Sequence, residues 1–269
     1  MLFRSESITY KNAPLYYRKT GKGPWVVLLH GFMESAEIWT GLAEVLEKEF
    51  SVLMIDLPGH GRSGMLGGVH TMQEMAAAVS AIIHYEEIPE YILCGHSMGG
   101  YIALELAASG AQRVKGLVLF HSHAAPDDEQ AKENRGRTVN IVKLNHTGFI
   151  HQFIPDLFAN ENRERLAGEI EILTNRAAAT PSRSIIASLE GMKVRTGSLD
   201  FLIQTELPLY FVIGKDDSRM PYNKVMAQAM LGRNVQILLL DKVGHMGFLE
   251  APEKVFPALR DFFRRCSES

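Results

Sequence analysis

The residues most able to do chemistry in this chain surround one serine. Residues 95–99 read Gly-His-Ser-Met-Gly, so Ser97 lies between two glycines. A strand-like run, 91–94, precedes this motif, and a helical pattern rich in small residues follows it. A serine on such a turn has a strained backbone and close neighbours, and glycine on either side leaves the necessary room. The pattern predicts that the Ser97 hydroxyl stands above a sheet as a nucleophile.

A serine nucleophile needs a histidine base, and the base needs a carboxylate to orient it. His245 follows the last strand-like run, 235–240, and the run 207–213 ends in Gly-Lys-Asp-Asp. Parallel strands end at one edge of a sheet, so Asp216 and Asp217 emerge at the same edge as His245. The chain order serine, acid, histidine suits a serine on a strand-to-helix turn. These arguments leave Asp216 and Asp217 both open as the acid.

Two backbone amides are predicted to stabilise the oxyanion that forms when the serine attacks a carbonyl group. One is the N–H of Met98, directly after the nucleophile. The other is the N–H of Phe32, in the loop His30-Gly31-Phe32 that follows the apolar run 25–29. Together these amides form the predicted oxyanion hole.

The elements that position these residues alternate between strand and helix patterns. Short apolar runs bounded by turn residues suit strands buried on both faces, as in a parallel sheet. Residues 2–10 and 14–19 suit a hairpin over Lys11-Asn12. The alternation predicts a mostly parallel sheet with helices on both faces. The strand-like runs are 25–29, 52–55, 91–94, 114–120, 207–213 and 235–240, and the helical patterns are 38–48, 72–85, 99–108, 222–231 and 251–264.

The alternation stops between the sixth and seventh strands. Residues 123–200 are polar and helical in pattern, with no strong strand run. This predicts one helical insertion in an otherwise continuous α/β unit.

With these motifs in order along the chain, the sequence resembles the α/β-hydrolase family, in its capped, esterase-like branch. The resemblance implies an eight-stranded, mostly parallel α/β sheet with helices on both faces. It also implies a core of residues 1–122 and 207–269 and a helical cap of residues 123–206 inserted after strand six. The matching segments are His30-Gly31-Phe32, residues 56–63 (Asp-Leu-Pro-Gly-His-Gly-Arg-Ser), 95–100 and 214–217, and Gly244-His245.

The resemblance also implies a catalytic triad of Ser97, Asp217 and His245, with no cofactor and no metal. The family places the acid three residues after a glycine, which selects Asp217 over Asp216. Phe32 and Met98 match the positions that supply the oxyanion-hole amides.

The predicted function is that of a serine hydrolase, a carboxylesterase that cleaves small carboxylic esters through an acyl-enzyme. A serine at position 97 argues against dehalogenase-like and epoxide-hydrolase-like members, which resemble this chain but carry aspartate there. Tyr101 replaces the arginine typical of members that act on menaquinone precursors. The alternatives are a carbon–carbon bond hydrolase or a perhydrolase-like enzyme of the same fold, or a small-molecule receptor with slow turnover.

Composition and charge exclude several other classes of protein. The 269 residues include 28 lysines and arginines against 31 aspartates and glutamates, a net charge of −3. This balance gives no general attraction to nucleic acid or to an anionic membrane. The longest apolar runs, such as 25–29, are far shorter than the roughly 18 residues that a membrane helix needs. With two cysteines and no apolar leader, we expect a cytoplasmic protein; the number of subunits is not specified.

Three further motifs have a simpler interpretation. Residues 59–64 fit G-x-G-x-x-G, but no helix opens at once and no acid ends a second strand, so a plain loop is predicted. His121 and His123 form an H-x-H pair without nearby ligands to complete a metal site, so we expect a strand end or pocket lining. Cys94 is expected in the core, on a buried strand.

Overall fold

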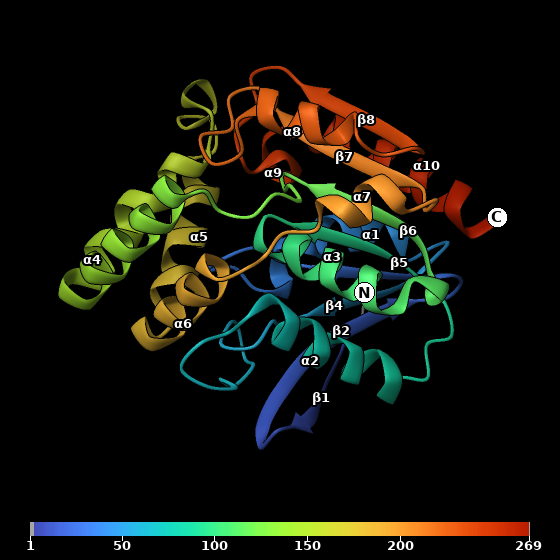
Figure 1. The fold of residues 1–269 in the computed structure, drawn as a ribbon, viewed down its shortest axis with the longest axis horizontal. Helices are drawn as coiled ribbons and strands as arrows, with labels where there is room; N and C mark the ends of the chain where they lie inside the picture. Colours follow the sequence, from blue (N-terminus) through green and yellow to red (C-terminus); the bar gives the residue numbers. More distant parts are fainter. Residues whose placement is uncertain (1–2, 269) are drawn as a thin grey trace.

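A single eight-stranded sheet forms the centre of the computed structural model, which describes residues 3–268 (Figure 1). The strand order is β1-β2-β4-β3-β5-β6-β7-β8. β1 pairs with β2 and β2 with β4 in antiparallel fashion, and all other neighbours are parallel. The predicted fold class is confirmed. The strands are β1 Arg4–Tyr10, β2 Ala13–Gly21, β3 Trp25–Leu29, β4 Ser51–Ile55, β5 Tyr91–His96, β6 Val114–Phe120, β7 Leu209–Gly214 and β8 Val235–Leu240.

The predicted N-terminal hairpin is present, formed by β1 and β2; residue 2 of the predicted run 2–10 lies outside the described residues. The backbone angles of the turn show why it forms. Lys11 and Asn12 have φ angles of 46° and 65°. A two-residue hairpin turn of this type needs positive φ at both central positions, which asparagine tolerates well.

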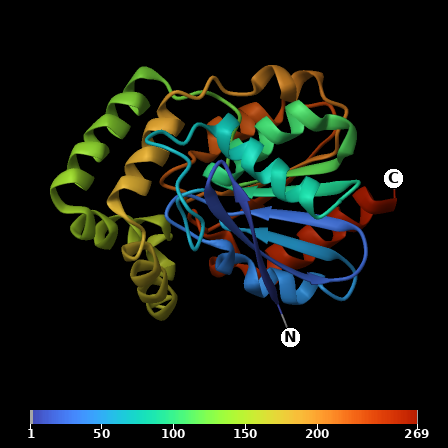
Figure 2. The same cartoon turned by 90° about the horizontal axis from the view of Figure 1, so that it is seen from below.

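Helices cover both faces of the sheet. Figure 2 shows α1 and α10 on one face and α2 and α3 on the other. The side chain of Thr71 accepts a hydrogen bond from the Glu74 amide at 3.1 Å and caps α2. The helices are α1 Thr40–Leu46, α2 Met72–Tyr85, α3 Met98–Gly110, α4 Glu129–Phe153, α5 Ala167–Ala178, α6 Ser182–Lys193, α7 Leu199–Gln204, α8 Tyr222–Ala229, α9 Gly247–Glu250 and α10 Pro252–Glu268, with short 3₁₀ turns at Ala36–Trp39, Ala111–Arg113, Pro155–Leu157 and Asn160–Asn162.

The chain between β6 and β7 is helical, as the interrupted pattern predicts. It contains α4, α5, α6 and α7. In Figure 1, α4, α5 and α6 form a group at one side of the sheet, whereas α7 lies next to the strands. No helix among residues 3–268 is long and apolar enough to cross a membrane.

The register of the central strands brings their carboxyl ends to one edge. Leu29 of β3 pairs with Gly95 of β5, and His96 of β5 pairs with Phe120 of β6. Phe120 pairs in turn with Val212 of β7. Side chains on β3, β4 and β5 are buried on both faces, which is why these strands read as continuous apolar runs. Loops that follow β3, β5, β6 and β7 therefore meet at the same edge.

Candidate active site

Ser97 occupies a strained turn between β5 and α3. Its φ is +51°, a conformation that residues other than glycine rarely adopt. The turn is held by three hydrogen bonds. The Ser97 amide donates to Phe120 O at 2.9 Å, while Ser97 O accepts from the Gly100 amide at 2.9 Å and from Ser122 Oγ at 2.8 Å.

The glycines beside Ser97 are required by close backbone contacts. A Cβ at position 99 would lie 2.5 Å from the carbonyl oxygens of Leu29 and His30. A Cβ at position 95 would clash with the backbone of Gly99. The turn can therefore form only because β3, β5 and α3 approach without side chains at these two positions.

Asp217 and His245 are in direct contact, and Asp216 is not part of this contact. Asp217 Oδ2 accepts a hydrogen bond from His245 Nδ1 at 2.8 Å. Asp217 Oδ1 accepts from the amides of Arg219 and Met220 at 2.8 and 2.9 Å. Asp217 is buried, whereas Asp216 is exposed. The geometry favours Asp217 as the acid partner of His245.

The protonation state of Asp217 fixes the tautomer of its partner. Burial alone would raise the pKa of Asp217, but the interactions with His245 and His121 hold it well below its usual range. An ionised carboxylate can only accept, so His245 Nδ1 carries the hydrogen. In neutral His245, Nε2 is then the unprotonated, basic nitrogen.

His121 is a second imidazole on Asp217 that the sequence did not point to. Its Nδ1 donates to Asp217 Oδ2 at 3.1 Å. Burial lowers the pKa of His121, so the ring is neutral. Its position at the end of a strand could have indicated this contact. That strand, β6, lies next to β7, and Asp217 follows the end of β7.

A buried ion pair between Glu34 and His96 also supports the site. His96 Nδ1 contacts Glu34 Oε2 at 2.9 Å, and His96 Nε2 contacts His245 O at 3.0 Å. Both ring nitrogens face acceptors, so both donate and the ring is an imidazolium. Burial would lower the pKa of His96, but the Glu34 carboxylate outweighs it and raises the pKa above its usual value. The sequence did not indicate this pair, because His96 occupies the variable second position of the G-x-S-x-G motif at residues 95–99.

The two amides predicted as the oxyanion hole are available to a ligand. Among residues 3–268, neither the Phe32 amide nor the Met98 amide has a hydrogen-bond acceptor. The Met98 amide opens α3, where the first turn leaves its N–H groups unpaired. Glu34 Oε2 accepts from the Gly31 amide at 2.5 Å and so ties the loop that carries Phe32 to His96.

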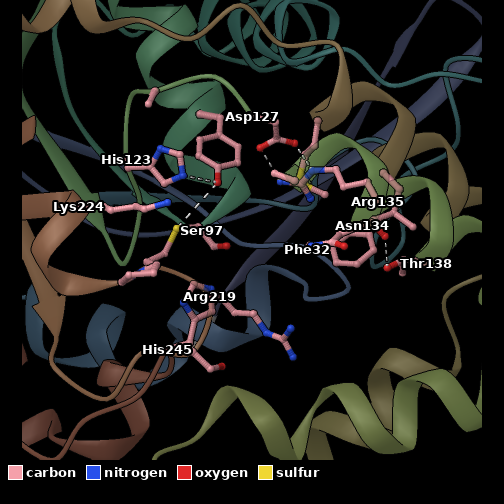
Figure 3. A pocket seen from close by; sticks show the side chains of 18 of the residues that line it. Phe32, Ser97, His123, Asp127, Asn134, Arg135, Thr138, Arg219, Lys224 and His245 are labelled. Carbon is pink, nitrogen blue, oxygen red and sulfur yellow. Dashed lines mark hydrogen bonds and ion pairs between the residues drawn. The ribbon is translucent and has the colours of Figure 1, made fainter. Parts of the chain in front are cut away.

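A cavity of about 680 Å³ connects these groups with the helices that follow β6. Its walls include Ser97, His245 and Phe32 from the sheet edge, with residues of α4 and α6 opposite. In Figure 3, Ser97 lies amid the labelled side chains, with Arg219 and His245 below it. The volume suits a small organic molecule. Within the described residues no hydrogen bond joins Ser97 to His245, and catalytic contacts of this kind often tighten only when a substrate binds.

The side chains that could suggest a metal site form hydrogen bonds with other protein groups. His121, Asp217 and His245 place one ligand atom each within 4.8 Å of one another, a geometry a metal could use. The hydrogen bonds from the two histidines already satisfy the Asp217 carboxylate, and His123 instead forms a hydrogen bond with the Tyr101 hydroxyl at 3.4 Å.

Residues 59–64 form a loop, and the next helix begins only at Met72. Cys94 is buried on β5, which raises the pKa of its thiol.

Residues 26–258 match the model of the alpha/beta hydrolase family, and the chain belongs to this family. It is 25% identical over 250 residues to a pimeloyl-[acyl-carrier protein] methyl ester esterase of Pseudoalteromonas atlantica, covering 88% of this chain and 93% of that protein. A protein of the same name from Nitrosomonas europaea is 26% identical, with 90% and 96% covered. A thermophilic esterase from Thermogutta terrifontis, solved with malate bound, is 31% identical with a TM-score of 0.92, covering 98% of this chain and 99% of that one.

Proposed function

We propose that this protein is a serine hydrolase, a carboxylesterase that cleaves small carboxylic esters through an acyl-enzyme on Ser97. One observation carries the proposal. Ser97, held at a φ of +51°, lines the same cavity as His245, whose Nδ1 donates to Asp217 at 2.8 Å. The similarity to proteins named as esterases supports the same reaction class.

In the proposed mechanism, His245 Nε2 takes the proton of the Ser97 hydroxyl as Ser97 Oγ attacks the ester carbonyl carbon. The amides of Phe32 and Met98 bind the resulting oxyanion. His245 then protonates the departing alcohol, and the acyl-enzyme forms. A water molecule, deprotonated by His245, attacks the acyl carbon. The bond from that carbon to Ser97 Oγ then breaks as His245 returns the proton to Ser97 Oγ, and the acid is released. Asp217 orients the imidazole and stabilises its cation throughout.

The proposal includes a cap made of residues 123–206 over a core of residues 1–122 and 207–269. Side chains of α4 and α6 lining the cavity support this division. We propose that the protein acts in the cytoplasm and that its substrates are small molecules.

Steady-state hydrolysis of p-nitrophenyl esters from acetate to decanoate tests the proposal. We expect repeated turnover by the wild type and a loss of about 10⁴-fold or more in kcat for Ser97→Ala. Ser109→Ala, at the far end of the same helix α3, serves as the matched control and should keep wild-type activity. An inactive wild type, or a Ser97→Ala variant that turns over normally, would refute the proposal.

A further inference from the structure

Two arginines, Arg135 of α4 and Arg195 after α6, share one carboxylate, Asp127, beside the cavity that Arg135 and Asp127 line. Arg135 of α4 donates from Nε to Asp127 Oδ2 and from Nη2 to Asp127 Oδ1, the latter at 3.3 Å. Arg195, which follows α6, donates from Nη1 to the same Asp127 Oδ1 at 2.5 Å. We call Asp127, Arg135 and Arg195 the arginine cluster. Two guanidinium groups share one carboxylate, so the cluster has a net charge of +1.

Most of the cluster is buried, whereas the Arg135 side chain keeps 22% of its surface exposed. Arg195 is 5% exposed and Asp127 is 8% exposed. Arg195 lies over the Tyr101 ring at 4.0 Å, and within the described chain its buried Nε has no hydrogen-bond partner. The rest of the Arg195 guanidinium is held by Asp127 and by the carbonyls of Met192 and Ala125, so the surplus positive charge is most accessible at Arg135. A second negative charge there would be favourable, because a partly buried charge is stabilised by a counter-charge.

The groups around the cluster do not supply the missing negative charge. Burial, reinforced by the charge of Arg195, lowers the pKa of His123 to about 4, so this ring is neutral. Lys224 adds a further, exposed cation on the cavity wall, and no ion pair of the described residues involves it. Asp128 also lines the cavity but is exposed, and its Oδ1 caps α4 at the Ala131 amide.

The arginine cluster lies within reach of a small molecule held at Ser97. Arg135, Tyr101 and Ser97 line one cavity, and Figure 3 shows Arg135 and Ser97 at it together. Tyr101 lies in the first turn of α3, which directly follows Ser97. Arg135 Nη1 donates to the weak acceptor Met192 Sδ at 3.4 Å, and the guanidinium also interacts with the Tyr101 side chain. Neither partner is a carboxylate, so Arg135 can still donate to an anionic ligand.

We propose that the arginine cluster binds a carboxylate carried by the substrate, so that the preferred esters are small and anionic. This inference rests on the proposed ester hydrolysis at Ser97 and specifies the substrate class. A second carboxylate beside Asp127 would balance the two guanidinium charges. The planar fork of an arginine suits a carboxylate, which it can bind through two parallel N–H donors.

The test compares anionic and neutral esters of matched length. On the acid side, the monomethyl esters of succinate, glutarate and adipate are compared with methyl butanoate, pentanoate and hexanoate. On the alcohol side, 3-acetoxypropanoate is compared with propyl acetate. We expect the anionic ester to have the higher kcat/KM by about tenfold or more on at least one side, which also reveals where the carboxylate sits.

Variants then connect this preference to the arginine cluster. Arg135→Gln should reduce the ratio of anionic to neutral kcat/KM towards unity, and Arg135→Lys should restore part of it, because lysine keeps the charge but not the fork. Arg137→Gln is the matched control, since Arg137 lies exposed on the same helix and pairs with Glu133. It should keep the wild-type ratio. If Arg219→Gln abolishes the preference for anionic esters and Arg135→Gln keeps it, the arginine cluster does not bind the substrate carboxylate.

Different results would refute the carboxylate-binding inference and the proposed esterase function. If neutral esters are cleaved in a Ser97-dependent manner and neither anionic series is preferred, the inference is wrong and the esterase proposal stands. If no ester is cleaved, the esterase proposal fails, and calorimetric titration with glutarate tests the cluster alone. Glutarate binding by the wild type that is lost in Arg135→Gln supports the cluster as a carboxylate site, and no binding by the wild type overturns it.

Discussion

Asp217 is the residue around which the hydrogen bonds of the site converge. It accepts from two imidazole rings, His121 and His245, and from two amides of its own turn. Four donors leave its carboxylate little rotational freedom, so the His245 ring is held in one orientation. The neighbouring carboxylate of Asp216 points to solvent and takes no part in this arrangement.

Substitution of these two aspartates should therefore have unequal effects. We expect Asp217→Asn to lower kcat by about 10³-fold or more, because the amide no longer stabilises the imidazolium and favours the wrong tautomer of His245. Asp216→Asn, the matched control one residue away, should stay within about threefold of wild type, as exposed substitutions usually do. Steady-state kinetics on one p-nitrophenyl ester measures both. A larger loss in Asp216→Asn would move the acid by one residue.

The element that presents Ser97 is the sharp connection between β5 and α3. Its geometry depends on contacts between the first turn of α3 and the end of β3, where Gly99 lies against the Leu29 and His30 carbonyls. These carbonyls belong to the loop that carries the Phe32 amide. The same close packing thus positions the proposed nucleophile and a proposed oxyanion donor relative to each other.

Gly99→Ala tests this packing. A Cβ at position 99 forces the helix away from β3, and we expect a loss of about 1–3 kcal/mol in the free energy of unfolding. Activity should fall as well, because Ser97 moves with the helix. Gly67→Ala is the control, since a Cβ there meets nothing within 4 Å. Urea unfolding gives the midpoints, and identical midpoints for Gly99→Ala and wild type would contradict the steric argument.

At the scale of the whole molecule, the loop that carries His245 is held between distant parts of the chain. The His245 amide donates to Leu157 O at 2.7 Å, after α4. The buried Glu250 carboxylate accepts from the Gly244 amide at 3.0 Å and from the Ala159 amide at 2.9 Å. The segment that follows α4 thus helps to place the proposed base.

Glu250→Gln should lower stability and activity together. Each carboxylate oxygen of Glu250 faces N–H donors, and a glutamine amide must present an N–H group to one of them. We expect a loss of about 1–3 kcal/mol in unfolding free energy. Glu253→Gln, exposed at the start of α10, is the control. Unchanged melting and unchanged kcat in Glu250→Gln would show that this clamp is dispensable.

The Glu34–His96 ion pair joins the loops after β3, β5 and β8, and it makes stability depend on pH. The pKa of His96 is raised, so its contribution is fully present below the ordinary histidine value and is lost as pH rises through the folded-state pKa. The pKa of Glu34 is lowered, so its contribution is lost only as pH falls through its own folded-state value.

Glu34→Gln removes this pH dependence. The difference in unfolding free energy between wild type and Glu34→Gln should therefore be larger near about pH 6 than near about pH 9. Urea unfolding at the two pH values measures it, with Glu37→Gln, half-buried near the same loop, as the control. A difference that grows with pH would mean that His96 is neutral in the folded protein.

Much of the architecture follows from local patterns in the sequence. The Lys11-Asn12 hairpin and the extent of α2 were both predicted, because turns and helical periodicity depend on residues only a few positions apart. The order of parallel strands also brings Ser97, Asp217 and His245 to one sheet edge, since each follows a strand end.

Only the tertiary structure decides which side chains meet at that edge. His121 reaches Asp217 across 96 positions of the chain, His96 reaches Glu34 across 62, and Arg195 reaches Asp127 across 68. No short-range periodicity encodes such pairs. They arise because β6 lies between β5 and β7 and because the helices after β6 return over the cavity. The burial of Asp217 and the exposure of Asp216 have the same origin, since the folded turn directs one carboxylate inward and the other to solvent.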